Sequence, residues 1–256
     1  MVARMVGPRE TSEQTRDFGY EEVPAAEHTR RVRDVFDSVA SRYDVMNDLM
    51  SGGIHRLWKA ELLNRIRPRP AERIVDVGGG TGDIAVGLAR RGAGNVVVID
   101  MTPDMLAVGR DRALDRGVLD GPAWIAGDAE RLPLADSSVD VYVTAFCMRN
   151  VTRPARALAE ARRVLRPAGR FFCLEFSRLA LPALRPLYDA YSFTVLPLLG
   201  QLVAGDAESY RYLAESIRRF PDQEAFAAMI ADAGLANVRV RNLTGGIAAI
   251  HSARRL

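Results

Sequence analysis

Hydrophobic positions near the start of the chain recur at the spacing of helices. From Glu27 onward, apolar residues return every three or four positions, which predicts a helix with one buried face. These residues are Val32, Val35, Phe36, Val39, Ala40 and Tyr43. A second helix is predicted over residues 55–66, and the glycine pair at 52–53 separates the two helices. We therefore expect a helical cap over residues 27–70, preceded by a polar, loosely held arm over residues 1–26.

From Arg73 the pattern changes to short apolar runs that alternate with helical segments. A continuously apolar run is typical of a parallel strand that is buried on both faces. The seven runs are RIVDV, NVVVID, PAWIA, VDVYVTAF, GRFFCLEF, NVRVRNLT and GIAAIHSA. A short glycine-bearing turn joins the last two, which predicts a hairpin at a sheet edge. The pattern predicts a Rossmann-like, doubly wound α/β fold with a seven-stranded, mainly parallel sheet and an antiparallel C-terminal hairpin, as one domain over residues 27–256.

Composition and charge limit the classes of function. The chain has 256 residues, of which 48% are hydrophobic and 26% charged, as in ordinary globular domains. No apolar run reaches the roughly 20 residues of a membrane span, and no signal segment is evident, so we expect a cytoplasmic protein. The net charge is +3. Its arginine clusters lack interleaved aromatic residues, so we expect no nucleic-acid partner, whereas peripheral contact with an anionic membrane surface stays open.

The two cysteines, Cys147 and Cys173, lie in apolar runs. We expect both to be reduced packing residues, and we assign no metal ligands.

A glycine-rich loop, DVGGGTGD, follows the first strand. Its glycines are spaced G-x-G-x-G, whereas a dinucleotide site needs G-x-G-x-x-G, and the position for that third glycine is Asp83. Asp76 and Asp83 bracket the loop, and their carboxylates suit a cationic or hydroxyl-rich ligand better than a pyrophosphate. Asp100 ends the next strand, where a carboxylate reaches the ribose hydroxyls of a nucleoside in this topology. The tripeptide at 127–129, GDA, ends the third strand, where adenine could be read.

This arrangement resembles that of the class I S-adenosylmethionine-dependent methyltransferases. From about Val32 to the C-terminus the chain also resembles the UbiE-type C-methyltransferases of ubiquinone and menaquinone biosynthesis. The motifs that carry this resemblance are YDVMNDLMSGGIHRLWK, VGGGTGD, GDAERLP, RNVT, AYSFTVLP, GDAESYRYLAESIRRFPDQE and LTGGIAAIH. The resemblance implies that S-adenosylmethionine is the cofactor and that the ring carbon of a polyprenylated quinol precursor is methylated.

The sequence of the N-terminal region is most similar to that of the ubiquinone-making members, so we expect a benzoquinol acceptor. Methylation of demethylmenaquinol, alone or as a dual activity, and a different small apolar acceptor stay open. A homodimer and membership of a quinone-synthesis assembly stay open too. A non-catalytic member of such an assembly would be expected to lose the glycine loop or Asp100, and both are present. A nucleic-acid methyltransferase would typically show an Asn/Asp-Pro-Pro-aromatic tetrad where this chain reads FCMR.

The resemblance implies a set of cofactor-binding residues. They are Gly78, Gly80, Thr81, Gly82, Asp100, Met101, Asp128 and Ala129. Thr81 is also placed to cap the helix that follows the glycine loop. Two departures from the family pattern stand out. Members usually have Ala at the position of Gly78, and commonly FGLRN where this chain has FCMRN, so Cys147 and Met148 put the shape of the substrate wall in question.

The catalytic residues are expected where the fourth strand ends. Arg149 is expected to stabilise a phenolate there and Asn150 to hold a ring hydroxyl, with His55 as a candidate base. Asp206 and His251 are the other base candidates, although His251 is expected to be structural, and His28 is expected to be exposed. Glu175 is a further candidate for substrate contact. The residues expected to line the acceptor and its tail are Tyr43, Asn47, Tyr188, Asp189 and Tyr191.

Two segments outside the core are expected to cover the methyl group. They are residues 41–59 of the cap and a substrate-covering insertion over residues 178–221, with residues 185–221 over the sulfonium. The glycine pair at 52–53 would let this lid bend.

Overall fold

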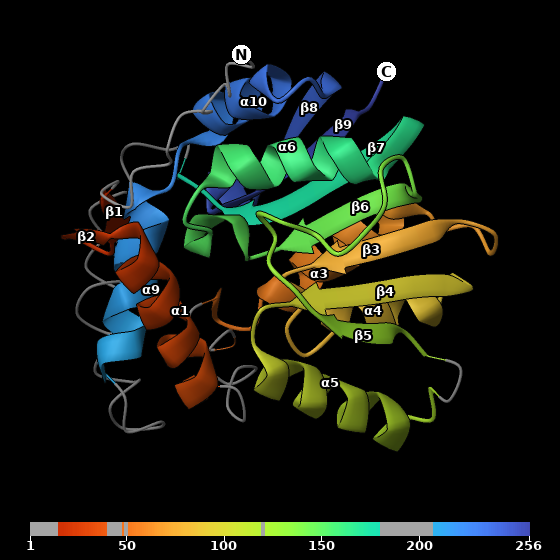
Figure 1. Cartoon of the computed structure of the whole chain (residues 1–256), viewed down its shortest axis with the longest axis horizontal. Helices are drawn as coiled ribbons and strands as arrows, with labels where there is room; N and C mark the ends of the chain where they lie inside the picture. The colour runs from red at the N-terminus through yellow and green to blue at the C-terminus, as the bar shows by residue number, and fades with distance from the viewer. Residues whose placement is uncertain (1–14, 40–47, 49–50, 119–120, 180–206) are drawn as a thin grey trace, which may run out of the picture.

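A computed structural model describes residues 15–39, 48, 51–118, 121–179 and 207–256, and they build an α/β fold around one large sheet (Figure 1). Its seven strands lie in the order β5-β4-β3-β6-β7-β9-β8. The strands are β3 (Arg73–Val77), β4 (Asn95–Asp100), β5 (Ala123–Ala126), β6 (Val139–Ala145), β7 (Leu165–Phe176), β8 (Ala236–Leu243) and β9 (Ala248–Arg254). The first five pair in parallel, and β9 runs antiparallel to both β7 and β8. The predicted fold and its C-terminal hairpin are confirmed.

Side chains alternate along each strand between two apolar layers. Ile74, Val98 and Val143 face one layer, while Val75, Ile99 and Tyr142 face the other. The first layer packs on α3 (His55–Ile66) and α4 (Asp83–Ala89), and the second packs on α6 (Pro154–Val164) and α10 (Gln223–Asp232). A remaining helix, α5 (Pro103–Asp115), connects β4 to β5. Both sheet faces are therefore covered, as the continuously apolar strand sequences require.

Two helices lie beyond the carboxyl ends of the parallel strands, α1 (Ala25–Val39) and α9 (Ala207–Arg219) (Figure 1). A small hairpin of β1 (Thr15–Phe18) and β2 (Glu21–Pro24) packs on α1, and β1 also contacts α9. The loosely held arm predicted over residues 1–26 is therefore wrong for residues 15–26, which form this hairpin and the first turn of α1. Gly19, which makes the turn between the two strands, is the sequence signal that the arm prediction overlooked.

The helix α9 lies within the predicted covering insertion, most of whose other residues, together with most of residues 40–50, lie outside the described residues. Within the described part of the chain, no helix is both long and apolar enough to cross a membrane.

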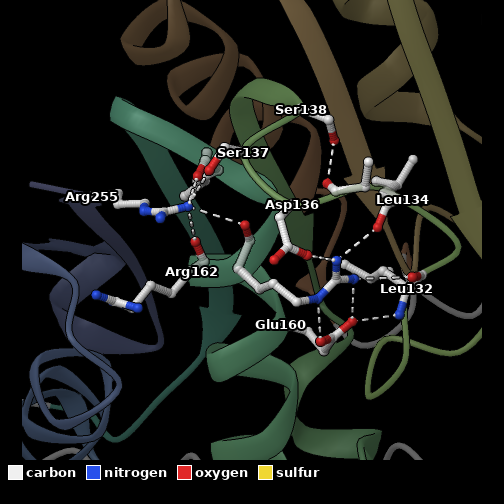
Figure 2. A network of polar contacts seen from close by, with 11 residues as sticks. Leu132, Leu134, Asp136, Ser137, Ser138, Glu160, Arg162 and Arg255 are labelled. Atoms are coloured by element: carbon white, nitrogen blue, oxygen red, sulfur yellow. Dashed lines mark hydrogen bonds and ion pairs between the residues drawn. The ribbon is translucent and has the colours of Figure 1, made fainter.

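A polar network closes the opposite, amino edge of the sheet (Figure 2). The guanidinium of Arg163, on α6, donates to both carboxylate oxygens of Glu160, to Asp136, and to the backbone oxygens of Leu132 and Leu134 at 2.7–3.1 Å. Glu160 also accepts from the backbone nitrogen of Leu132. These bonds fix the loop between β5 and β6.

Candidate active site

The main cavity lies at the carboxyl edge, beside the point where the strand order reverses between β3 and β6. It holds about 810 Å³ of space including its open mouth, a size suited to a small molecule. Six of the predicted cofactor residues line it: Gly78, Gly80, Asp100, Met101, Asp128 and Ala129. Thr29, Val32 and Phe36 of α1 form part of the same wall. The N-terminal cap therefore covers a space that the sheet edge leaves open.

The glycine loop is shaped by close contacts that exclude side chains. Gly82 has φ +75°, and a Cβ there would lie 2.3 Å from the ring of Trp124 on β5. Gly82 is also the N-cap of α4, so the prediction that Thr81 caps this helix is wrong. The backbone nitrogen of Ala85 in the first turn instead donates to Oδ2 of Asp76 at 3.2 Å. Thr81 is buried and lines a second, smaller cavity.

Gly78 and Phe146 line both this smaller cavity and the main one, so the two cavities are neighbours. Asp76 lines it and is fully buried, and its Oδ1 has no partner among the described residues. Burial raises the pKa of Asp76 to about 7. A buried carboxylate oxygen without a partner is costly, so this cavity is suited to a ligand that brings a positively charged donor.

Asp100 is held by backbone amides at the end of β4. Its Oδ2 accepts from the nitrogen of Gly80 at 2.8 Å, and its Oδ1 accepts from the nitrogen of Thr102 at 2.9 Å. Burial raises the pKa of Asp100, although these amides oppose the shift. The Thr102 side chain and the Met101 backbone also hydrogen-bond to the carboxylate, which lines the main cavity, where it can accept from hydroxyls.

The adjoining wall is formed by the segment after β5. Oδ1 of Asp128 accepts from the nitrogen of Glu130, which fixes a tight turn. Glu130 in turn accepts from the backbone nitrogen and the guanidinium of Arg153, at 2.8 and 2.6 Å. All three residues line the main cavity. The pair Glu130–Arg153 thus joins the predicted cofactor wall to the segment after β6.

The two departures from the family pattern, at Gly78 and at Cys147, lie next to each other in the structure. A Cβ on Gly78, which has φ +64°, would lie 2.1 Å from Sγ of Cys147. Cys147 lines the cavity, and burial raises the pKa of its thiol to about 12. The prediction that both cysteines are packing residues is therefore right only for Cys173, which is buried in the sheet. Met148 is buried in the layer against α6 and forms no part of the cavity wall.

Phe146 directly follows β6 in a conformation that is unfavourable for a bulky residue, with φ +57°. Its ring lies 4.8 Å from that of Phe176 and 6.4 Å from that of Trp58. Because it lines both cavities, its strained backbone places an aromatic wall at their junction.

Arg149 points into the protein. Its side chain is 1% exposed, and Nη1 donates to Oε1 of Glu175 and to the backbone oxygen of Phe146, both at 2.7 Å. Neither Arg149 nor Glu175 lines the two cavities. The structure thus brings the two together in a buried ion pair, and their direct roles toward substrate stay predictions.

Asn150 does line the main cavity, next to Thr152. Its Oδ1 accepts from the hydroxyl of Tyr212 on α9 at 3.2 Å, and the Tyr212 ring stacks on Phe18 of β1 at 4.2 Å. The described insertion residues therefore support the wall of the main cavity through Asn150.

The three histidines are all buried. Nε2 of His55 lies 2.9 Å from Oδ1 of Asp48, and His55 lines neither cavity, so the structure gives no support to its predicted role as a base. His251 bonds to the backbone oxygen of Gln223, consistent with its predicted structural role. The prediction that His28 is exposed is wrong, because its Nδ1 lies 2.9 Å from the hydroxyl of Thr152.

Several predicted residues lie outside the described residues, and so their roles stay predictions. They are Tyr43, Asn47, Tyr188, Asp189, Tyr191 and Asp206. Sequence reasoning also missed residues that line the site, namely Thr29, Lys59, Glu130 and Arg153. Lys59 carried a signal, because it is the only lysine in the chain.

Comparison with known proteins agrees with this geometry. The family model of the ubiE/COQ5 methyltransferase family matches residues 25–255. A protein of Acidiphilium cryptum named ubiquinone/menaquinone biosynthesis C-methyltransferase UbiE is 55% identical, over 96% of this chain and 99% of its own length. A mitochondrial protein of Arabidopsis thaliana named 2-methoxy-6-polyprenyl-1,4-benzoquinol methylase is 50% identical, over 93% and 90%.

Among solved structures, a SAM-dependent methyltransferase from Thermotoga maritima, described as a possible histamine N-methyltransferase, superposes with a TM-score of 0.64. It is 19% identical and covers 88% of this chain and 100% of that one, a likeness that shows the fold alone. The long, full-length matches show more, and the chain belongs to the ubiE/COQ5 methyltransferase family.

Proposed function

We propose that this chain transfers a methyl group from S-adenosylmethionine to a ring carbon of a polyprenylated benzoquinol, a step of ubiquinone biosynthesis. The observation that supports the proposal is the pair of adjacent cavities at the carboxyl edge. The main cavity is lined both by predicted cofactor residues and by apolar residues of α1 with Asn150, and the smaller one is lined by Asp76 and Thr81. The names of the relatives from Acidiphilium and Arabidopsis support the acceptor class.

The residues present fit S-adenosylmethionine. Its methionyl end carries an ammonium group, which matches the unpartnered Oδ1 of Asp76. Its ribose hydroxyls match Asp100, whose oxygens are oriented by Gly80 and Thr102. Its adenine matches the wall at Asp128 and Ala129. When bound, the cofactor supplies a methyl group on a positively charged sulfur.

The chain's own residues position the acceptor and limit water. Val32 and Phe36 offer an apolar face for a flat ring, and Phe146 closes the junction of the two cavities. Charge is lost when a phenolate attacks a sulfonium, so a dry and apolar site favours the reaction. Holding the two reactants in line supplies much of the remaining rate enhancement. Asn150, with its oxygen held by Tyr212, is placed to orient a ring hydroxyl.

Loss of the ring hydroxyl proton requires a base, and the structure adds His28 to the candidates. The hydroxyl of Thr152 lines the cavity and lies 2.9 Å from Nδ1 of His28. Burial lowers the pKa of His28, so the ring is neutral at neutral pH and can accept a proton through Thr152. In a His28→Gln variant we expect the acidic limb of the kcat–pH profile to change, which a purely structural role would not produce.

Demethylmenaquinol is the second acceptor that we consider, because the Acidiphilium relative's name includes menaquinone. We propose that the protein meets either lipid at a membrane surface from the cytoplasm, where its arginine clusters would favour anionic headgroups.

The test has two parts. The purified protein is incubated with S-adenosylmethionine and either 2-methoxy-6-polyprenyl-1,4-benzoquinol or demethylmenaquinol, and methylated products are identified by mass spectrometry. In parallel, the quinones of cells that lack the gene are profiled. We expect the benzoquinol to be methylated and a ubiquinone precursor without one ring methyl to accumulate. Accumulation of demethylmenaquinone alone would change the acceptor, and an unchanged profile in cells without a redundant enzyme would overturn the proposal.

A further inference from the structure

Lys59 is the only lysine of the chain, and it reaches from the cap to the glycine loop. It lies on α3, and its Nζ donates to Oδ2 of Asp83 at 2.7 Å. Its side chain is only 13% exposed, and it lines the smaller cavity together with Asp76. Besides joining α3 to α4, Lys59 thus places a positive charge at a cavity that a buried carboxylate also lines.

The smaller cavity is lined by one cation, Lys59, and by two carboxylates, Asp76 and Asp83. Asp76 offers an oxygen that has no partner among the described residues, and the charge of Lys59 is close enough to oppose the effect of burial on the pKa of Asp76. Burial alone would raise the pKa of Asp83, but the charge and hydrogen bond of Lys59, with smaller contributions from Arg116 and His55, outweigh it and lower that pKa. Asp83 therefore holds Lys59 at the cavity as an ion pair.

Asp83 has a second cation nearby. Nη1 of Arg116 lies 3.9 Å from Oδ1 of Asp83, the oxygen that Lys59 does not contact. Lys59 can share its ammonium with a ligand without leaving Asp83 unpaired. An ammonium has three donor hydrogens, and the bond to Asp83 uses one of them.

We propose that Lys59 binds the α-carboxylate of S-adenosylmethionine, while Asp76 binds the α-ammonium. The methionyl end bears both charges on one carbon, and the cavity bears their complements. This inference rests on the proposed function, because it assumes that S-adenosylmethionine is the ligand. It makes the helical cap part of the cofactor site.

The test uses a ligand pair that differs only in the carboxylate. Binding of S-adenosylmethionine and of its decarboxylated form is measured by calorimetry with the whole protein. The wild type is expected to prefer the carboxylated ligand by about 10- to 100-fold, the range of a charged hydrogen bond. In Lys59→Gln this preference is expected to vanish, while affinity for the decarboxylated ligand changes less than about twofold.

Two further variants distinguish ligand binding by Lys59 from a purely structural role of its ion pair with Asp83. Lys59→Arg keeps the charge and is expected to keep part of the preference. Lys59→Gln/Asp83→Asn replaces the ion pair by a neutral pair, so it also tests the case in which the single variant fails to fold. It too is expected to lose the preference at an unchanged melting temperature.

The outcomes are distinct. Equal weakening of both ligands in the Lys59 variants overturns the inference and leaves Lys59 as a brace. Failure of the wild type to bind either ligand overturns the proposed function itself.

Discussion

The two edges of the sheet use charged residues in opposite ways. At the amino edge, Arg163 makes hydrogen bonds to Glu160, to Asp136 and to two backbone oxygens, so its guanidinium donates to partners within the protein (Figure 2). At the carboxyl edge, Asp76 keeps an oxygen without a described partner, and the carboxylate of Asp100 lines a cavity. The difference teaches that partner saturation, and not charge or burial alone, separates structural from ligand-binding groups.

Asp100→Asn is expected to have the largest effect on binding. It removes the charge that orients ribose hydroxyls, and we expect affinity for S-adenosylhomocysteine to fall about 100-fold, measured by calorimetry. The exposed Asp104→Asn on α5 is the matched control and should bind normally. If the Asp100→Asn variant binds S-adenosylhomocysteine within twofold of wild type, Asp100 is a structural group and not a ligand-binding one.

Gly78→Ala tests the contrast between the two edges most severely, because we expect it to lower both ligand affinity and the free energy of unfolding. The residue has φ +64°, and its Cβ would meet Cys147. We expect about 2–3 kcal/mol of destabilisation by chemical denaturation, from backbone strain and the clash.

Adding Cys147→Gly should recover about half of this loss, because it removes the clash but leaves the strain. Strictly additive effects of the two substitutions would show that their contact carries no energy.

Arg163→Met should sharpen the comparison from the other edge. We expect the free energy of unfolding to drop by about 2 kcal/mol, because the part-buried oxygens of Glu160, Leu132 and Leu134 lose a charged donor. Affinity for S-adenosylhomocysteine should stay within twofold of wild type. The matched control is Arg254→Met, at an exposed residue whose described side-chain hydrogen bond, to the backbone oxygen of Ala168, is 3.5 Å long. It should change the free energy of unfolding by less than about 0.5 kcal/mol. A large loss of affinity in Arg163→Met would contradict the separation of the two edges.

The smallest expected effect is a pH dependence of binding. Since the pKa of Asp76 is raised to about 7, the unliganded carboxyl is protonated below that pH and cannot pair with an ammonium. Affinity for S-adenosylhomocysteine should thus be about tenfold weaker at pH 6 than at pH 7.5.

The same shift acts on stability with the opposite sign. The folded protein holds this proton between the ordinary value of 3.8 and about 7, so the Asp76 contribution to unliganded stability falls as pH rises through that window. Asp76→Asn should remove both dependences. A flat binding profile in the wild type would exclude Asp76 as the ammonium partner.

The sheet was predictable because each strand is a short apolar run between turns, and Asp100 was predictable because it ends such a run. The inward turn of Arg149 was not predictable, because position after a strand does not reveal that Glu175, 26 residues later, takes up the guanidinium. His28 was missed for a similar reason, since its partner Thr152 is 124 residues away. Sequence pattern gives local placement, whereas long-range pairing decides which way a side chain points.

The contact between the first hairpin and α9 has a consequence for biosynthesis. The backbone nitrogen of Tyr20 donates to Glu215, 195 residues later, and Gly19 leaves no room for a Cβ against that same side chain. Because the stack of Phe18 on Tyr212 supports Asn150, the cavity wall at Asn150 cannot be completed until α9 has left the ribosome. Contacts between residues so far apart in sequence slow folding, because a long loop must close before they form. A nascent chain that ends before α9 lacks both Tyr212 and Glu215, so it cannot complete this wall.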